Sequence, residues 1–391
     1  MFITEETLKV GIQSTVVDYN QSGLGRYATE LLEGYHTLEK KVTLIRYKNN
    51  NGWTNHCGFK EVFSKRLPYY TNIPLQIAAM VRKSKCNLIH YPVHFSENIG
   101  SYLINNRVKT VLTIHDIAPM LHDNDKRIWY DQPDIETQTL WQWGLRLASK
   151  RADHIITVSE NTKRDCVKYL GIPPEKITVI PCAASPIFHP RPEKDVIAFL
   201  HNIGIRQPYV FYTGGLSSRK NVERLLDAYE ILCEEGYWHN LLIAGNSPDK
   251  THAESIQNRF GDRVIFTGHV PPQTLAYLYC GADMFVYPSL YEGFGIPPLE
   301  AMASGTPTIT SNTSSLPEVV GDAGIMVDPN STSELYCAMK LVANNKNVRD
   351  KLKFSGLERA SHFKWIDIAK QTWKVYEDIF YYDRAQEIPL L

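Results

Sequence analysis

Two glutamates flanking a glycine- and proline-rich turn are the strongest sign of chemistry in this sequence. In PSLYEGFGIPPLEAMASGTPTIT, residues 288–310, seven residues separate Glu292 from Glu300. The pattern predicts a strand end, a turn and a helix, because the glycines allow close backbone approach and the prolines suit a first helical turn. The carboxylates can bind hydroxyls of one elongated ligand, whose anionic middle would meet backbone N–H groups. These N–H groups belong to Phe294, Gly295 and Ile296.

A second stretch, YTGGLSSRKNVERLL (residues 212–226), carries two adjacent cations where we expect a helix to begin. The preceding strand ends at Gly214 and the helix starts near Asn221, so Arg219 and Lys220 stand at the helix start. Unpaired N–H groups and the positive end of the helix dipole favour anions there. A planar guanidinium and a compact ammonium can together bind a diphosphate. Basic pairs at helix starts are also common on ordinary surfaces, so this stretch only adds to the first.

The stretch DYNQSGLGRYATEL, residues 18–31, contains the G-x-G-x-x-A spacing of a dinucleotide-binding turn. Such a turn follows the first strand directly, and an acidic residue ends the second strand. Here the first strand ends ten residues before Gly23, and the second, VTLIRYKNN, ends in lysine and asparagine. A dinucleotide-dependent oxidoreductase is therefore a remote alternative. We expect the glycines to serve close approach to a different phosphate-bearing ligand at a helix start.

Two patterns that resemble metal sites have simpler interpretations. HYPVH places His90 and His94 four residues apart, but the intervening proline and the strand-like NLIHY remove the shared helical face that ligation would need. One of the two histidines is expected to line a cleft at a strand end. The acidic triplet at residues 123–125 lies in a polar loop with no strand before it, which favours a solvated turn. We therefore expect no metal site and no cofactor.

The chain alternates between short apolar, β-branched runs and amphipathic helical segments. This alternation is typical of parallel sheets covered by helices, and it restarts after the proline-rich stretch PCAASPIFHPRPEKD at residues 181–195. The sequence therefore predicts an α/β protein with two Rossmann-like parallel-sheet domains. Expected strands lie at residues 8–13, 41–47, 86–92, 109–116, 153–159 and 176–181, and at 208–215, 239–246, 262–269, 283–289, 305–311 and 323–329.

Composition limits the possible partners. The 42 basic and 42 acidic residues cancel, which argues against nucleic acid as the main partner. Residues 1–190 have 23 basic and 18 acidic side chains, a mild excess that would suit peripheral contact with an anionic membrane but is also ordinary variation. Seven cysteines without a C-x-x-C pair, a polar start and no long apolar stretch favour a reduced, cytoplasmic protein, and a place at the inner face of the membrane is compatible with them.

Taken together, these motifs resemble those of the family-4 retaining glycosyltransferases, which have the GT-B fold. The resemblance rests on EGFGIPPLEAMASGTP, GGLSSRKN, TIHDIAPML, ADHIITVSENTKRDCVKYLGIPPEKITVIP and SSLPEVVGDAGIMVDP, which follow the family order over nearly the whole chain. TIHD and GLGRY are closest to bacterial mannosyltransferases of polymannose O-antigen synthesis. Where many relatives have Asn-Gly after VIP, this chain has Cys182–Ser185, with an effect on hinge or acceptor contacts that the sequence does not define.

The resemblance implies roles at matching positions. Arg219 and Lys220 would bind the donor diphosphate, Glu292 the donor sugar and Glu300 the ribose. His115 would face the transferred sugar, a loop at Gly23–Arg26 would close over the donor, and Val270 would lie near the base. The implied catalytic residues are His115, Arg219, Lys220 and Glu292, and the implied donor-binding residues are Gly23, Gly25, Arg26, Gly214, Val270, Phe294, Gly295, Ile296 and Glu300.

The resemblance also implies two domains facing a deep cleft. We expect an acceptor-binding domain at residues 1–185, a donor domain at 186–364 and a helical tail at 365–391 that packs back on the first domain. The implied reaction is metal-independent, retaining transfer of a hexose from a nucleotide sugar to a glycan or lipid-linked glycan, with GDP-mannose as the favoured donor. Another donor, a small-molecule acceptor, an epimerase or phosphorylase, and a non-catalytic sugar-nucleotide binder remain open.

Overall fold

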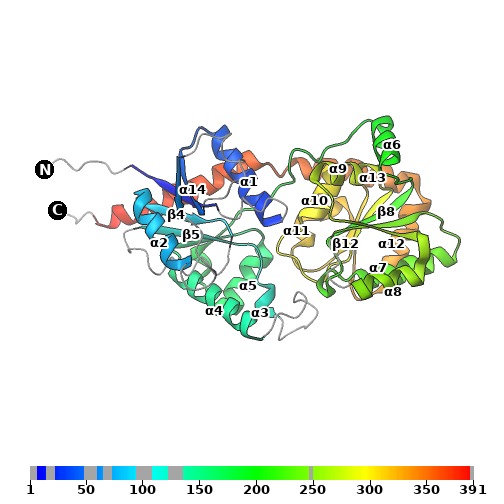
Figure 1. The fold of residues 1–391 in the computed structure, drawn as a ribbon, viewed down its shortest axis with the longest axis horizontal. Coiled ribbons are helices and arrows are strands. Elements are labelled where there is room, and N and C mark those ends of the chain that lie inside the picture. Colours follow the sequence, from blue (N-terminus) through cyan, green and yellow to red (C-terminus); the bar gives the residue numbers. More distant parts are fainter. Residues whose placement is uncertain are drawn as a thin grey trace. The chain divides into compact units, whose positions relative to one another are not determined.

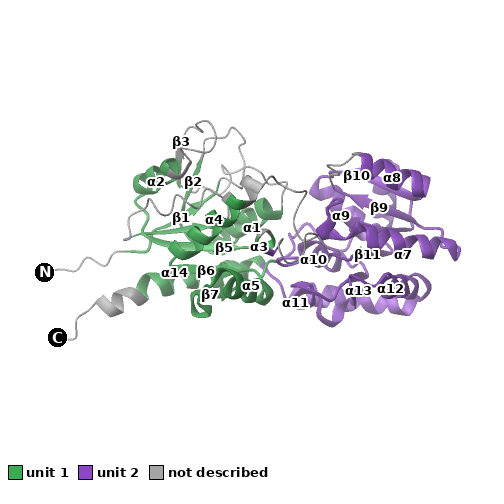
Figure 2. Ribbon diagram, turned by 90° about the horizontal axis from the view of Figure 1, so that it is seen from below, with its two compact units in different colours: residues 1–120, 133–182, 365–391 green, residues 121–132, 183–364 purple. Residues whose placement is uncertain are grey.

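The computed structural model describes residues 7–14, 23–47, 60–64, 73–93, 108–121, 135–245 and 250–387. The chain divides into two compact units (Figures 1 and 2). Unit 1 comprises residues 1–120, 133–182 and 365–391, and unit 2 comprises residues 121–132 and 183–364. Each unit is built on one parallel sheet.

Unit 1 contains a seven-stranded sheet in the order β3-β2-β1-β4-β5-β6-β7. The inner strands are apolar and buried along their length, as expected where helices cover both faces. The strands are β1 (Val10–Gln13), β2 (Val42–Tyr47), β3 (Lys60–Ser64), β4 (Leu88–Tyr91), β5 (Lys109–Ile114), β6 (His154–Thr157) and β7 (Ile177–Val179). The helices are α1 (Gly23–Thr37), α2 (Ile73–Ser84), α3 (Ala118–Leu121, at the boundary with unit 2), α4 (Ile135–Arg151), α5 (Glu160–Leu170) and α14 (Trp365–Glu387).

Unit 2 contains a six-stranded parallel sheet in the order β10-β9-β8-β11-β12-β13. Its core is formed by the buried faces of these strands and of the helices that connect them. The strands are β8 (Tyr209–Thr213), β9 (Asn240–Ala244), β10 (Val264–Gly268), β11 (Met284–Tyr287), β12 (Thr308–Ser311) and β13 (Ile325–Val327). The helices are α6 (Glu193–Asn202), α7 (Val222–Glu234), α8 (Lys250–Phe260), α9 (Pro272–Gly281), α10 (Ile296–Ala303), α11 (Leu316–Val320), α12 (Thr332–Asn344) and α13 (Lys346–Ser361).

The C-terminal helix α14 belongs to unit 1, where it packs along α1. The two helices lie close together at Gly34, where a Cβ atom would lie 2.6 Å from the Cβ of Ala369, so no larger residue fits without a shift. The aromatic stripe of α14 is at most 9% exposed. It consists of Trp365, Trp373, Tyr376 and Phe380, and its packing role confirms the sequence interpretation.

Two expectations for the amino-terminal part are wrong in detail. The segment Gly23–Arg26 is the first turn of α1, not a loop. β3, whose sequence KEVFS carries two charges, was not expected as a strand. All the strands that were expected are present. Within the described residues, no helix is both long enough and apolar enough to cross a membrane.

Candidate functional site

The candidate donor site lies at the carboxyl edge of the unit 2 sheet. β8 and β11 pair directly, so the segments that follow them emerge side by side. After β8 the chain forms a short 3₁₀ turn, Ser218–Lys220, which carries Arg219 and Lys220. After β11 it reaches Glu292. Sheet topology therefore brings Glu292 to the adjacent pair Arg219 and Lys220, although Lys220 lies 72 positions earlier in the sequence.

The Glu292 carboxylate is enclosed by hydrogen-bond donors. Its Oε1 atom accepts from Lys220 Nζ at 2.7 Å, from the Tyr287 hydroxyl at 3.0 Å and from the Ser289 hydroxyl. Its Oε2 atom lies 3.2 Å from Arg219 Nη1, which also donates to the carbonyl of Tyr291. We call these four side chains with Glu292 the glutamate cluster. It is almost completely buried, with Glu292 7% exposed and Arg219 2% exposed.

Electrostatics keep this carboxylate ionised. Burial by itself would raise the pKa of Glu292, but Arg219, Lys220 and the hydrogen bonds outweigh it and lower the pKa to about 2. For the neighbouring Tyr287, burial and then the Glu292 charge raise the pKa of the phenol well above its usual range. Tyr287 therefore remains a neutral donor. With two cations and one anion, the glutamate cluster carries a net charge of +1.

The turn after Glu292 presents backbone N–H groups at the start of α10. Gly295 has φ of +117° and forms the N-cap, and a Cβ atom there would lie 2.9 Å from Leu316, so the position requires glycine. Among the described residues, the N–H groups of Phe294, Gly295 and Ile296 donate to no protein acceptor. They therefore have the chemistry needed for an anion or a sugar oxygen.

The other donor-side residues occupy different settings. Gly214 directly follows β8, and its Cβ position would lie 3.5 Å from Lys220 Cε, so it borders the glutamate cluster. Val270 is half-buried between β10 and α9. Glu300 lies inside α10, is 1% exposed and accepts a hydrogen bond from the Tyr279 hydroxyl at 3.1 Å. This partner, Tyr279, is not a member of the glutamate cluster.

Four residues around Glu292 were missed in the sequence. Tyr287 and Ser289 belong to the glutamate cluster, and Ser314 and Ser315 hydrogen-bond to the backbone of the following turn. Tyr287 ends β11 and Ser289 follows it, and polar residues at a strand end are a usable signal. The two serines come from the turn before α11, about 20 positions later, and only the pairing of β11 with β12 brings them near.

His115 lies in unit 1, directly after β5. Its Nε2 atom is 2.8 Å from the carbonyl oxygen of Pro92, and because a carbonyl only accepts, Nε2 carries the proton. The Tyr27 ring meets the imidazole edge-on at 4.6 Å between centroids, and Trp365 meets Tyr27 at 5.6 Å. Aromatic packing and the hydrogen bond from Nε2–H to the Pro92 carbonyl oxygen thus help to place His115.

The first turn of α1 leads directly to Tyr27, the residue whose ring contacts His115. Gly23 is exposed, Gly25 is buried and Arg26 is half-buried, and Tyr27 follows them directly. The segment that precedes α1 lies outside the described residues. In the described part, the GLGRY motif therefore supplies the ring that contacts His115.

His90 is fully buried, so of the pair His90 and His94 it is not the one that could line a cleft. Its two ring nitrogens are hydrogen-bonded to the Thr113 hydroxyl at 2.8 Å and to the Tyr376 hydroxyl, which in turn meets the Tyr35 hydroxyl at 2.7 Å. Burial, and then the nearby His115, lower the pKa of His90 to about 3. This neutral network joins β4, β5, α1 and α14. His94, the other member of the pair, lies outside the described residues.

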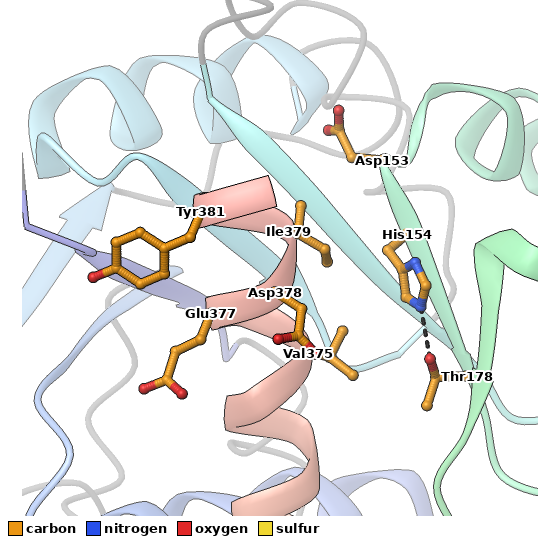
Figure 3. A pocket seen from close by; sticks show the side chains of 8 residues that line it. All are labelled: Asp153, His154, Thr178, Val375, Glu377, Asp378, Ile379 and Tyr381. Atoms are coloured by element: carbon orange, nitrogen blue, oxygen red, sulfur yellow. Dashed lines mark hydrogen bonds between the residues drawn. The ribbon is translucent and has the colours of Figure 1, made fainter. Parts of the chain in front are cut away.

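A pocket of about 720 Å³ lies elsewhere in unit 1 (Figure 3). His154, which begins β6, and Asp153 line it at the amino edge of the sheet, opposite the edge where His115 lies. Its carboxylates are engaged, since Asp153 accepts from the Thr110 N–H and Asp378 pairs with Lys374. The remaining lining residues are Thr178, Val375, Glu377, Ile379 and Tyr381. The pocket contains none of the predicted site residues.

Two further expectations meet the structure only in part. Among the described residues, no group of three or more His, Cys, Asp or Glu side chains could hold a metal ion, and the acidic triplet at residues 123–125 lies outside them. In the Cys182–Ser185 segment, Cys182 is completely buried, and burial raises the pKa of its thiol. The second segment of unit 1 ends at Cys182 and unit 2 resumes at Ala183, so this departure from the family pattern falls at a boundary between the units.

Two family models match the chain and together span most of it. Residues 21–186 match "Glycosyltransferase Family 4", and residues 194–359 match "Glycosyl transferases group 1". The chain belongs to this glycosyltransferase family. It is 28% identical over 398 residues to O-antigen chain mannosyltransferase B of Escherichia coli, covering 95% of this chain and all of that relative.

Solved structures agree on the fold. Sucrose-phosphate synthase from Thermosynechococcus elongatus has a TM-score of 0.76 at 21% identity, covering 96% of this chain and 99% of that one. HepE from Anabaena, in complex with UDP-glucose, has a TM-score of 0.74 at 17% identity, covering 95% of this chain and all of that one. This glycosyltransferase therefore has the GT-B fold, with two Rossmann-like parallel-sheet units, as the sequence predicted.

Proposed function

We propose that this glycosyltransferase moves mannose from GDP-mannose to a hydroxyl of a growing or lipid-linked glycan, with retention of anomeric configuration. The donor and acceptor are suggested by the mannosyltransferase that it resembles over its full length. The site that would do this is the glutamate cluster with the N–H groups of Phe294–Ile296. Mannose transfer in cell-surface polysaccharide synthesis is thus the function that the chain supports best.

The observation that carries the proposal is the ionised Glu292 held between Arg219 and Lys220. During transfer, negative charge grows on the leaving diphosphate and positive charge grows on the sugar ring. A site with net charge +1 and preorganised N–H donors stabilises the first, and a carboxylate that accepts sugar hydroxyls orients the second. In this proposal Glu300 holds the ribose and Val270 contacts the base.

The proposed reaction is a same-face displacement. The bond between the anomeric carbon and the diphosphate oxygen breaks, and the acceptor oxygen forms a bond to that carbon on the same face. The acceptor proton moves to a phosphate oxygen of the leaving group, so atoms and charge balance. His115, with Nε2–H held by Pro92, would face the transferred sugar, and the α1 start at Gly23, Gly25 and Arg26 would cover the donor.

We propose that no metal is required, because Arg219, Lys220 and the helix-start N–H groups would supply the charge stabilisation. Transfer should therefore persist in excess chelator. Complete loss that Mg²⁺ restores would instead direct attention to the acidic triplet at residues 123–125.

We further propose that the enzyme works in the cytoplasm, with peripheral contact of unit 1 at the inner face of the membrane. The mild basic excess of residues 1–190 supports this contact. Co-sedimentation with vesicles of anionic and of neutral lipid at two salt concentrations tests it. Equal binding to both would contradict it.

A second donor keeps the same fold and chemistry. The structural relative HepE is in complex with UDP-glucose, so a uridine-based donor is the specific competitor of GDP-mannose. A small-molecule acceptor is compatible with either donor. A non-catalytic sugar-nucleotide binder and a dinucleotide-dependent oxidoreductase are the remaining alternatives. Product from a labelled donor separates catalysis from mere binding, and NAD titration tests the oxidoreductase.

The deciding experiment is a panel of nucleotide sugars assayed for binding and slow hydrolysis, followed by acceptor screening with the best donor. GDP-mannose should bind best. With a donor labelled at the anomeric carbon, NMR of the product should show the donor's own anomeric configuration. An inverted product would overturn the retaining mechanism, and preference for a uridine donor would overturn the mannose assignment.

A further inference from the structure

Ser314 has a backbone conformation that serine rarely adopts. Its φ is +59°, in the left-handed region, and it lies in the turn between β12 and α11. A side chain with a Cβ is strained there, so glycine or asparagine would ordinarily be favoured. Such strain persists where the surroundings hold it, and it concentrates at functional sites. The presence of serine at position 314, where its side chain is strained, therefore calls for a structural explanation.

The hydroxyl of Ser314 supplies that explanation by engaging both backbone polar groups of one residue. It accepts a hydrogen bond from the Glu292 N–H at 3.0 Å and donates to the Glu292 carbonyl oxygen at 2.6 Å. The hydroxyl of the adjacent Ser315 lies 2.6 Å from the Phe294 carbonyl oxygen and 2.9 Å from the Glu292 carbonyl oxygen, and it can donate to either. The turn before α11 thus grips the backbone between the ionised carboxylate and the N–H groups that begin α10.

The grip acts at the junction between two halves of the proposed donor site. On one side the Glu292 side chain is fixed by the glutamate cluster. On the other side, the N–H groups of Phe294, Gly295 and Ile296 follow within four residues. Their position relative to the carboxylate depends on the peptide groups of Glu292, which are those that Ser314 holds.

We propose that Ser314 is a positioning residue that keeps the Glu292 carboxylate and the Phe294–Ile296 N–H groups in register for the donor. It acts through the Glu292 backbone and is not itself a catalytic residue. Backbone strain at position 314 is retained because the hydroxyl is needed there. This inference rests on the proposed donor site, and it adds a residue that the sequence motifs do not assign.

Two variants and a matched control separate the hydroxyl from the strain. Ser314→Gly removes both, and Ser314→Ala removes the hydroxyl but leaves a Cβ in the left-handed region. Lys85→Gly relieves the same strain at an exposed position after α2, with φ of +59° and no link to the site. We expect both Ser314 variants to lose roughly 10-fold in kcat, since small misplacements of reacting groups are costly. Lys85→Gly should keep its kcat.

Hydrogen exchange gives a second readout that needs no substrate. In both Ser314 variants the amides of residues 292–296 should exchange faster than in the wild type, because the turn has lost its anchor. In Lys85→Gly they should be unchanged. Thermal unfolding should show Ser314→Gly to be at least as stable as Ser314→Ala, so an equal kinetic loss in the two would be due to the hydroxyl.

Wild-type kcat and unchanged exchange at residues 292–296 in either folded Ser314 variant would overturn the proposal. A loss in Ser314→Ala that Ser314→Gly recovers would also overturn it, because strain would then be the cause. Failure of the proposed function is a separate result: the wild type would transfer no sugar and bind no nucleoside diphosphate. The exchange comparison would still decide whether Ser314 holds the turn.

Discussion

His115 in unit 1 and Glu292 in unit 2 both follow the carboxyl end of a parallel strand, yet their surroundings differ in kind. Glu292 is held by two cations and two hydroxyls. His115 is held by a carbonyl oxygen and an aromatic ring, beside a buried histidine that stays neutral. Glu292 is thus held through buried charge, and His115 through neutral groups.

The difference matches two separate tasks in the proposed reaction. A leaving diphosphate needs fixed positive charge, which only a costly buried ion cluster can supply. A group that faces a sugar needs shape and a defined tautomer, which neutral packing can supply without burying charge. Experiments that disturb each environment should therefore give effects of different size and different pH dependence.

The largest expected effect is acid weakening of unit 1. Burial lowers the pKa of His90 to about 3, so below the ordinary histidine pKa of about 6.5 the unfolded chain binds a proton that the folded chain does not. The free energy of unfolding should therefore fall as pH drops from about 6.5 to about 3, by roughly 4–5 kcal/mol in all. Glu292 behaves differently, because its stabilisation is lost only as pH falls from about 4.5 towards 2.

Hydrogen exchange at pH 7 and pH 5 checks this directly. Peptides from β4 and α14 should lose protection at pH 5 while peptides around Glu292 keep theirs. In a folded His90→Gln variant the pH effect on unit 1 should be smaller. Equal loss in both units of the wild type would contradict the assignment to His90.

A comparable effect is expected when the charge balance of unit 2 is broken. Glu292→Gln leaves Arg219 and Lys220 buried without their anion, and removal of one partner from a buried ion pair costs about 3–5 kcal/mol. Chemical denaturation should show this loss together with loss of transfer. The exposed Glu254 of α8 offers the control, since Glu254→Gln should change neither quantity. Unchanged stability in Glu292→Gln would show that the cluster carries less charge than described.

Lys220→Ala should reduce turnover by on the order of 10²-fold or more, as expected for a lost transition-state charge partner. Steady-state kinetics with the best donor measure this. Lys194→Ala, which alters an exposed lysine of α6, should leave turnover unchanged. Near-normal turnover in Lys220→Ala would sink the leaving-group role of this lysine.

The smallest effect is expected from the aromatic contact to His115. Tyr27→Phe keeps the ring edge and should be close to wild type, whereas Tyr27→Leu removes it. Aromatic pairs are worth about 0.5–1.5 kcal/mol beyond burial. A double-mutant cycle of Tyr27→Leu with His115→Ala on kcat should give a coupling of about this size. Strictly additive losses would mean that Tyr27 supports the fold without placing His115.

The charged residues of the proposed donor site were predictable because each lies within a short, recognisable motif. Glu292, Arg219 and Lys220 lie in short motifs, and the glycines and helix starts of these motifs indicate an anion-binding site from the local sequence alone. Ser314 was not predictable, because its contact with Glu292 depends on the pairing of β11 with β12 and on one left-handed residue. The GLGRY motif was interpreted as a loop, although glycine at a first helical turn is equally consistent with its spacing.

In unit 1 the sequence predicted most strands but not their order in the sheet. β3 was missed because KEVFS carries charges typical of an exposed segment. One of His90 and His94 was expected at a cleft because their strand ends nearby, whereas two hydroxyl partners from other elements keep His90 in the core. Contacts made across a sheet or between distant helices leave little trace in a local pattern.

The return of α14 to unit 1 has a consequence for biosynthesis. Unit 1 is completed by the last helix of the chain, whose Tyr376 is fully buried, whereas every described element of unit 2 precedes that helix. On the ribosome, unit 2 can therefore finish folding while the earlier unit still exposes the surface that α14 will cover. A stop codon before residue 365 would therefore remove the α14 helix that covers unit 1, and it would leave every described element of unit 2 in the chain.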